Sequence, residues 1–170
     1  AGTLSTSGSS GIDLNGGAFT LSGVVTATGG GAVTITNSGT LSIAAAADMS
    51  LDGAFTQDGS GAVSLAGDIT TSGDDISFSG PVTLTGDVAL STGSGAGDIS
   101  FAGTVDGAYD LSLTAGTGDI TFSDSVGGTT ALSSLSVVSA GSGTFAGTLS
   151  TSGSSGIDLN GGAFTLSGAV

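Results

Sequence analysis

The chain has 170 residues and a formal net charge of −14, all of it from aspartate, because the sequence contains no Glu, Lys, Arg or His. Without cationic side chains the protein cannot neutralise phosphates, which excludes binding to nucleic acid or to an anionic membrane surface. The absence of cysteine excludes disulfides, zinc–thiolate sites and cysteine nucleophiles. Hydrophobic residues make up 38% of the chain, enough to build a core, so we expect a folded protein.

No apolar run approaches the length of a membrane span, so we expect no membrane insertion of this segment. No secretion signal is recognisable either, and a signal for export would have to lie outside these residues. Helices are also not expected, because Gly, Ser, Thr and Asp interrupt every segment long enough to form one.

The opening segment, residues 1–23, returns letter for letter as residues 146–168, at an offset of 145 residues. Such identity predicts one unit of a tandem array followed by the start of the next. Neither end resembles a capping repeat. We therefore expect residues 1–170 to form a single continuous solenoid segment, continued by further copies of the same repeat in the same chain or end to end.

Between the two copies the recurring pattern is alternation of apolar residues with Ser or Thr, which predicts short strands. In chain order these strands are VTIT from Val33, ISFSG from Ile76, PVTLTG from Pro81, ISFAG from Ile99, LSLTAG from Leu111 and ITFSD from Ile120. Glycine clusters separate them and indicate sharp corners.

One motif can be followed along the whole chain: an aliphatic residue, a small polar one, a large apolar one, then a glycine-containing bend. Its starts fall at Ile12, Val33, Met49, Ile76, Ile99, Ile120, Gly143 and Ile157, at intervals from 14 to 27 residues. Two residues after each start, stacking predicts an inward column of Leu14, Ile35, Leu51, Phe78, Phe101, Phe122, Phe145 and Leu159. After the bend it predicts a second column of Phe19, Leu41, Phe55, Val82, Val105, Val126 and Leu149.

These columns predict an all-β fold, a parallel β-helix (β-solenoid) with about seven coils of about 21 residues per 145-residue repeat. One coil cannot offset its own ordering cost, so only the stack can fold. Tandem immunoglobulin-like modules are the rival fold, since they too combine short strands with glycine turns.

The stretch from Gly103 to Gly141 resembles the repeats of filamentous haemagglutinin-like bacterial surface proteins, the long exoproteins of two-partner secretion systems. This resemblance implies that the β-helix is right-handed. It also implies export across an outer membrane, an extracellular or cell-surface location, and a role in adhesion or a biofilm matrix. It transfers no functional residues to this chain.

Catalysis is not expected, because the residues that usually supply acid, base or nucleophile are missing apart from Asp, Ser, Thr and Tyr109. Asp74 and Asp75 are adjacent, and neighbours in a strand point to opposite faces, so they make a poor carboxylate pair. We therefore assign no catalytic, cofactor-binding or metal-binding residues and predict that the chain is not an enzyme.

Four aspartates, Asp48, Asp75, Asp98 and Asp119, each precede a motif start, so stacking predicts an acidic column with carboxylates about 4.8 Å apart. Two interpretations remain open. Each Asp could cap its corner by accepting backbone N–H bonds, or Ca²⁺ could bridge successive coils.

The sequence favours an extracellular structural filament or adhesin stalk, with a surface or glycan receptor as a further partner. The alternative is a module that binds Ca²⁺ or a surface ligand such as polysaccharide or ice. Three Thr-x-Thr motifs, Thr26–Thr28, Thr34–Thr36 and Thr83–Thr85, would form a threonine array only if they stacked in consecutive coils, and their spacing predicts that they do not.

Overall fold

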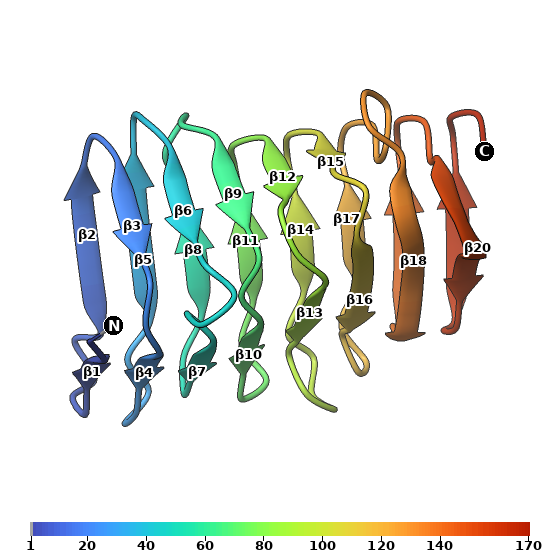
Figure 1. Cartoon of the computed structure of the whole chain (residues 1–170). Coiled ribbons are helices and arrows are strands. Elements are labelled where there is room, and N and C mark those ends of the chain that lie inside the picture. The colour runs from blue at the N-terminus through green and yellow to red at the C-terminus, as the bar shows by residue number, and fades with distance from the viewer. Residues whose placement is uncertain (1) are drawn as a thin grey trace.

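The computed structural model describes residues 2–170 and contains strands, turns and bends, with no helix among those residues. Ala1, the first residue of the repeated segment, lies outside the described residues. The strands stack side by side into three sheets that run along the molecule, as Figure 1 shows. The protein is therefore an all-β parallel β-solenoid, as the alternation predicted.

Most strands are three to five residues long, and up to β17 each sheet takes every third strand of the chain. Sheet A contains β1 (Leu4–Thr6), β4 (Val25–Ala27), β7 (Met49–Leu51), β10 (Ile69–Thr71), β13 (Val88–Ser91), β16 (Asp110–Thr114), β18 (Leu132–Ser139) and β20 (Thr151–Leu159). Sheet B contains β2 (Ile12–Gly16), β5 (Val33–Asn37), β8 (Phe55–Gln57), β11 (Ile76–Phe78), β14 (Ile99–Phe101), β17 (Ile120–Phe122), β19 (Ser142–Phe145) and β21 (Ala163–Leu166).

Sheet C is shorter and contains β3 (Phe19–Leu21), β6 (Leu41–Ile43), β9 (Val63–Leu65), β12 (Val82–Leu84) and β15 (Val105–Asp106). Isolated parallel bridges from Val105 to Val126 and from Val126 to Leu149 continue this face. Every pairing between the described strands is parallel and joins one coil to the next, which excludes the hairpins of immunoglobulin-like modules.

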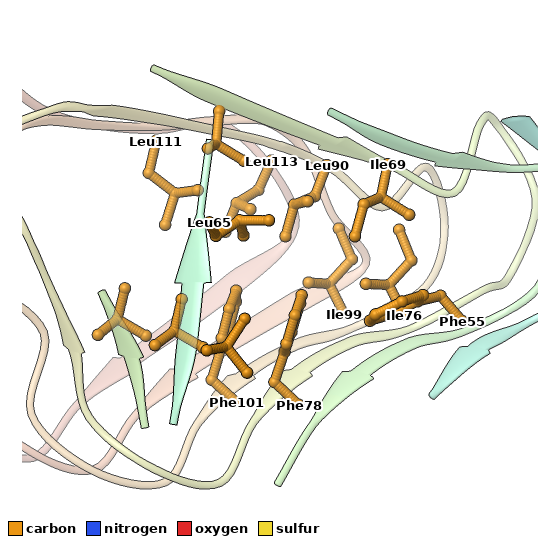
Figure 2. Close-up of a cluster of buried hydrophobic side chains, with 14 of the residues drawn as sticks. Phe55, Leu65, Ile69, Ile76, Phe78, Leu90, Ile99, Phe101, Leu111 and Leu113 are labelled. Atoms are coloured by element: carbon orange, nitrogen blue, oxygen red, sulfur yellow. The ribbon is translucent and has the colours of Figure 1, made fainter. Parts of the chain in front are cut away.

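The core is a single column of apolar side chains enclosed by the three sheets. Strand residues two apart share a face, so the first and third residues of a typical strand are buried while the middle one faces outward. Figure 2 shows the rings of Phe78 and Phe101 side by side, with Ile69 and Leu90 of sheet A opposite them. Ring centroids are 5.2 Å apart for Phe78 and Phe101, and 4.7 Å apart for Phe101 and Phe122. These aromatic residues lie in one core, as the motif predicted.

Two motif starts were assigned wrongly. Met49 lies on sheet A, and the sheet B position opposite Val33 and Ile76 belongs to Phe55. Ile157 also lies on sheet A, opposite Leu135, and the sheet B position after Gly143 belongs to Phe164. With these corrections, sheet B positions recur at regular intervals of 21 to 23 residues.

The predicted inward columns change accordingly. Gln57 replaces Leu51 and Leu166 replaces Leu159 in the column that contains the stacked phenylalanines. On sheet C, Val63 replaces Phe55 between Leu41 and Val82. Gly143 was placed correctly, and the structure explains the missing side chain, because a β-carbon there would overlap the ring of Phe164.

The core contains a buried amide pair, Asn37 and Gln57, which are 1% and 0% exposed. Gln57 Nε2 donates to Asn37 Oδ1 and to the Gly59 carbonyl, both at 2.7 Å. Gln57 Oε1 accepts from the backbone N–H groups of Ser79 at 3.0 Å and Gly80 at 2.9 Å. One side chain therefore links its own coil to the coils on both sides.

Candidate functional surfaces

Three aspartates form a row along the leading edge of sheet B. Asp75, Asp98 and Asp119 directly precede β11, β14 and β17, whose residues pair in register. The Asp98 amide donates to Asp75 Oδ1 at 2.8 Å, and the Asp119 amide donates to Asp98 Oδ1 at 2.7 Å. The Ser142 hydroxyl continues the row by donating to Asp119 Oδ1 at 2.9 Å.

Asp48 does not belong to this row, which corrects the predicted four-member column. It precedes β7 on sheet A, and its Oδ1 accepts the Asp68 amide at 3.0 Å. Asp68 Oδ1 in turn accepts the Ala89 amide at 2.8 Å. Asp48 and Asp68 therefore begin a second row of the same kind on another face.

In both rows the carboxylates accept a donor of the following coil, which is a backbone N–H for Asp75, Asp98, Asp48 and Asp68 and the Ser142 hydroxyl for Asp119. The predicted capping bonds are therefore present, but they connect neighbouring coils instead of closing a turn within one coil. Each of these side chains therefore adds a hydrogen bond between neighbouring coils, directly before the first residue of its strand. Hydrogen bonds to a charged acceptor are stronger than neutral ones, and this offsets the repulsion between stacked like charges.

A different geometry surrounds Asp52, whose Oδ2 accepts the amides of Gly29 and Gly30, both at 3.1 Å. Both glycines have positive φ, 80° and 77°, so two successive N–H groups point at one carboxylate oxygen. The Ser72 hydroxyl donates to Asp52 Oδ1 at 2.9 Å. Ser72 first, then Gly30 and Gly29, lower the pKa of Asp52 below its ordinary value.

Asp110 has its pKa lowered in the same direction by the hydroxyls of Ser133 and Ser134. A lowered folded-state pKa stabilises the fold above the unfolded-state pKa of about 3.9, and this stabilisation is lost as the pH falls through the folded-state pKa. Both carboxylates therefore favour the fold at neutral pH and stop doing so in acid.

Replacing Ser72 by alanine is expected to raise the pKa of Asp52 toward its ordinary value, because the hydroxyl is the largest cause of the shift. The pKa of Asp110 should stay unchanged, since its partners lie on other coils. Carbon-13 NMR of the aspartate carboxyl groups against pH measures both in one titration. An unchanged Asp52 titration would show that the glycine amides alone hold the shift.

The other surface feature is a set of hydroxyl rows, one at the outward position of each sheet. On sheet B the paired residues are Thr34, Thr56, Ser77, Ser100, Thr121, Thr144 and Thr165. On sheet A they are Ser5, Thr26, Ser50, Thr70, Ser91, Thr114 and Ser139, and on sheet C they are Thr20, Ser42, Ser64 and Thr83. Neighbouring hydroxyls in a row lie about one strand spacing apart, about 4.8 Å.

The Thr-x-Thr motifs do not stack on one another, as their spacing predicted. Thr26, Thr34 and Thr83 belong to sheets A, B and C respectively. The rows instead take one hydroxyl from each of several consecutive coils, including strands such as ISF that contain no Thr-x-Thr motif. These rows depend on the register between coils, so they do not follow from the sequence alone, although nearly every strand has Ser or Thr at its middle position.

Asp74 and Asp75 are both exposed, and the Asp75 carboxylate belongs to the acidic row. Asp68, Asp87 and Asp110 line an open hollow on sheet A with Val88, Ala89 and Ser112. Within residues 2–170 no three carboxylates come close enough together to form a metal-binding group. The same residues contain no helix that is long and apolar enough to cross a membrane.

The geometry therefore offers rows of hydroxyls on all three sheets and rows of carboxylates beside sheets A and B, built by the regular stacking of coils. Comparison with known proteins found no matching family model, no matching curated protein and no matching solved structure.

Proposed function

We propose that this protein is a segment of an extracellular structural filament or adhesin stalk, built of tandem β-solenoid repeats and related to filamentous haemagglutinin-like surface proteins. The observation that carries the proposal is the continuity of sheets A and B and of the single core along the described coils, with the sheet C face continued by isolated parallel bridges beyond β15. Each coil adds about 4.8 Å of length at constant cross-section, so tandem repeats make a stiff rod.

The outermost described coils can accept more coils. Leu4 and Leu166 are 37% and 40% exposed, and Leu14 and Phe19 are only half-buried, although inner members of their rows are buried. Residues 1–23 pair with the segment that follows them through Leu4–Val25, Ile12–Val33 and Phe19–Leu41. The identical residues 146–168 have the side chains to pair with the same continuation, so the expected partner is another copy of the repeat.

The surface chemistry suits such a role. Most outward strand positions are hydroxyls or carboxylates, and the chain has no cationic side chain to neutralise its −14 charge. A rod of this composition stays hydrated and is repelled by nucleic acid and by anionic membrane surfaces. These properties suit an exposed stalk that holds a binding tip away from a cell surface.

Electron microscopy of a chain carrying several tandem repeats tests the filament. We expect thin, unbranched rods whose length grows by about 32 Å per 145-residue repeat, at about 4.8 Å per coil. Fibre diffraction of aligned rods should give an axial reflection at the same 4.8 Å spacing. Beads joined by flexible linkers, with no such reflection, would overturn the proposal.

The hydroxyl row on sheet B supports a second candidate, binding of a polysaccharide or another ordered surface. Seven successive coils present a hydroxyl at the same position, which gives regularly spaced donors and acceptors. Substituting Ser77, Ser100 and Thr121 by valine should then abolish binding to immobilised polysaccharide. The matched control substitutes Ser42, Ser64 and Thr83 on sheet C, and equal binding by both variants would exclude the sheet B row as the site.

A further inference from the structure

The two identical segments occupy different faces of the solenoid. Ile12 lies on sheet B, whereas its counterpart Ile157 lies on sheet A. Phe19 lies on sheet C, whereas Phe164 lies on sheet B. Leu4 pairs on sheet A, and its counterpart Leu149 bridges to Val126 on the sheet C face. Every element of the second copy is therefore displaced by one face in the same direction.

Outside the serine-rich link between these elements, the two copies make similar local contacts. Gly11 and Gly156, which directly precede Ile12 and Ile157, both have positive φ, 70° and 61°. Gly16 lies against the ring of Phe19, and Gly161 lies against the ring of Phe164. Ile12, Leu14 and Phe19 pack against the core, and so do their counterparts Ile157, Leu159 and Phe164. The displacement is thus a change of face and not a change of fold.

The structural difference lies in the serine-rich link. In the first copy, residues 7–11 form the corner between β1 and β2. In the second copy, residues 152–156 run within β20, where the pairing shifts between Leu132–Thr151 and Ser134–Gly156. Ser and Gly carry too little apolar surface to fix either arrangement, so the contacts of the neighbouring coils decide which one forms.

The size of the displacement follows from counting how many times the chain moves from one sheet to the next between equivalent residues of the two copies. The chain visits sheets A, B and C in turn, and it makes twenty such steps from Leu4 to Leu149. Seven complete coils would take twenty-one steps. The 145-residue repeat is therefore six and two-thirds coils long, one face short of closure.

We infer that consecutive copies of the repeat are rotated by a third of a turn about the solenoid axis. This inference rests on the tandem array proposed above. The acidic row beside sheet B in one copy lies beside sheet A in the next and beside sheet C in the one after that. The original face returns after three copies, which is twenty coils or about 96 Å at 4.8 Å per coil. A partner that recognises one row therefore meets it on all three sides of the rod.

Disulfide cross-linking of the 170-residue chain tests the displacement directly, because the chain contains no cysteine of its own. Ser136 pairs with Asp158 on sheet A, and adjacent parallel strands place paired Cα atoms within disulfide range. We expect Ser136→Cys/Asp158→Cys to oxidise to an intramolecular disulfide. Alkylation followed by intact mass measurement should then find no free thiol.

A second double variant tests the alternative, in which the repeat is seven whole coils long and the second copy returns to the same faces as the first. If residues 146–168 kept the faces of residues 1–23, Asp158 would lie on sheet B beside Thr144, and Thr144→Cys/Asp158→Cys would cross-link instead. In the observed arrangement the strand beside β19 on sheet B is β21, where Thr144 pairs with Thr165. Thr144→Cys/Thr165→Cys should therefore cross-link as well. Cross-linking of Thr144→Cys/Asp158→Cys without that of Ser136→Cys/Asp158→Cys would overturn the rotation but leave the filament standing, whereas beads in electron microscopy would overturn the filament.

Discussion

Replacing Phe101 by alanine is expected to lower the free energy of unfolding by about 3–5 kcal/mol. The side chain is 1% exposed and lies between Phe78 and Phe122, parallel to both rings within 4°. Removing it takes away its apolar burial and two stacking contacts, and it leaves a cavity that flat sheets on three sides cannot close. Urea unfolding followed by circular dichroism measures the loss.

The matched control is Ser100→Ala, because Ser100 lies next to Phe101 on the same strand and faces outward. Its effect should stay within about 0.5 kcal/mol of wild type. Phe164→Ala should cost less than Phe101→Ala, because Phe164 is only half-buried and has a coil on one side alone. Equal effects of the three substitutions would contradict a core built from one continuous aromatic column.

The damage should also be local. Each coil of a solenoid contacts only its two neighbours, so a cavity at Phe101 weakens the stacking of β14 against β11 and β17. Hydrogen exchange should therefore accelerate at the amides of these strands. The amides of β5, which lies three strands away from β14 on sheet B, should keep their protection. Uniform acceleration along the chain would indicate a fully cooperative unit.

Much of the fold could be predicted from alternation alone. The strands at Val33, Ile76, Val82, Ile99, Leu111 and Ile120 all occur, because an apolar residue at every second position in a glycine-rich chain suits a short strand with one buried face. Assigning these strands to faces was harder. Strands on all three sheets have the same inside–outside pattern, so similarity of motif does not distinguish one face from another.

The error at Met49 has a specific cause. The true sheet B strand is Phe55–Gln57, and its third residue is an amide where the motif requires a large apolar side chain. MSL on sheet A, six residues earlier, fits the motif better, and Asp48 directly precedes it, so the motif predicts both at the sheet B position. The error at Ile157 arose because letter-for-letter identity with residues 1–23 implied the same face. The regular interval of 21 to 23 residues along one sheet was the better guide.

The candidate surfaces depend on register even more strongly. Aspartate before a strand was visible in the sequence, but its hydrogen bond goes to a residue 21 to 23 positions further on. No local pattern predicts such a partner. The two positive-φ glycines that face Asp52 lie 22 and 23 residues before it, and they too are brought together only by stacking.

Gln57→Glu is the substitution for which we expect a large and pH-dependent effect. One carboxyl oxygen can keep the N–H groups of Ser79 and Gly80, but the other faces the Asn37 Oδ1 atom and the Gly59 carbonyl, both acceptors now 2.7 Å from Gln57 Nε2. Burial and these two acceptors disfavour the charged form, so the introduced carboxyl has a raised pKa in the folded state.

The sign of the pH dependence follows from this direction. A group whose folded-state pKa is raised stabilises the fold fully below its unfolded-state pKa, about 4.3, and this stability is lost as the pH rises through the folded-state value. A shift of about three units corresponds to about 4 kcal/mol between pH 4 and pH 8. Urea unfolding at a series of pH values, expressed as the difference from wild type, removes the contribution of the native aspartates.

Gln57→Met separates the charge from the lost hydrogen bonds. Methionine has nearly the same shape but leaves the Gly80 amide, the Asn37 Oδ1 atom and the Gly59 carbonyl without the partner that Gln57 supplies, whereas the Ser79 amide keeps the Gln57 backbone carbonyl at 2.9 Å. Each buried group left unpaired costs about 1–3 kcal/mol. That cost should not change with pH, because methionine does not titrate. If Gln57→Glu followed the same flat profile as Gln57→Met, the introduced carboxyl would have reached water, and the amide pair would not be the sealed link between three coils that its burial indicates.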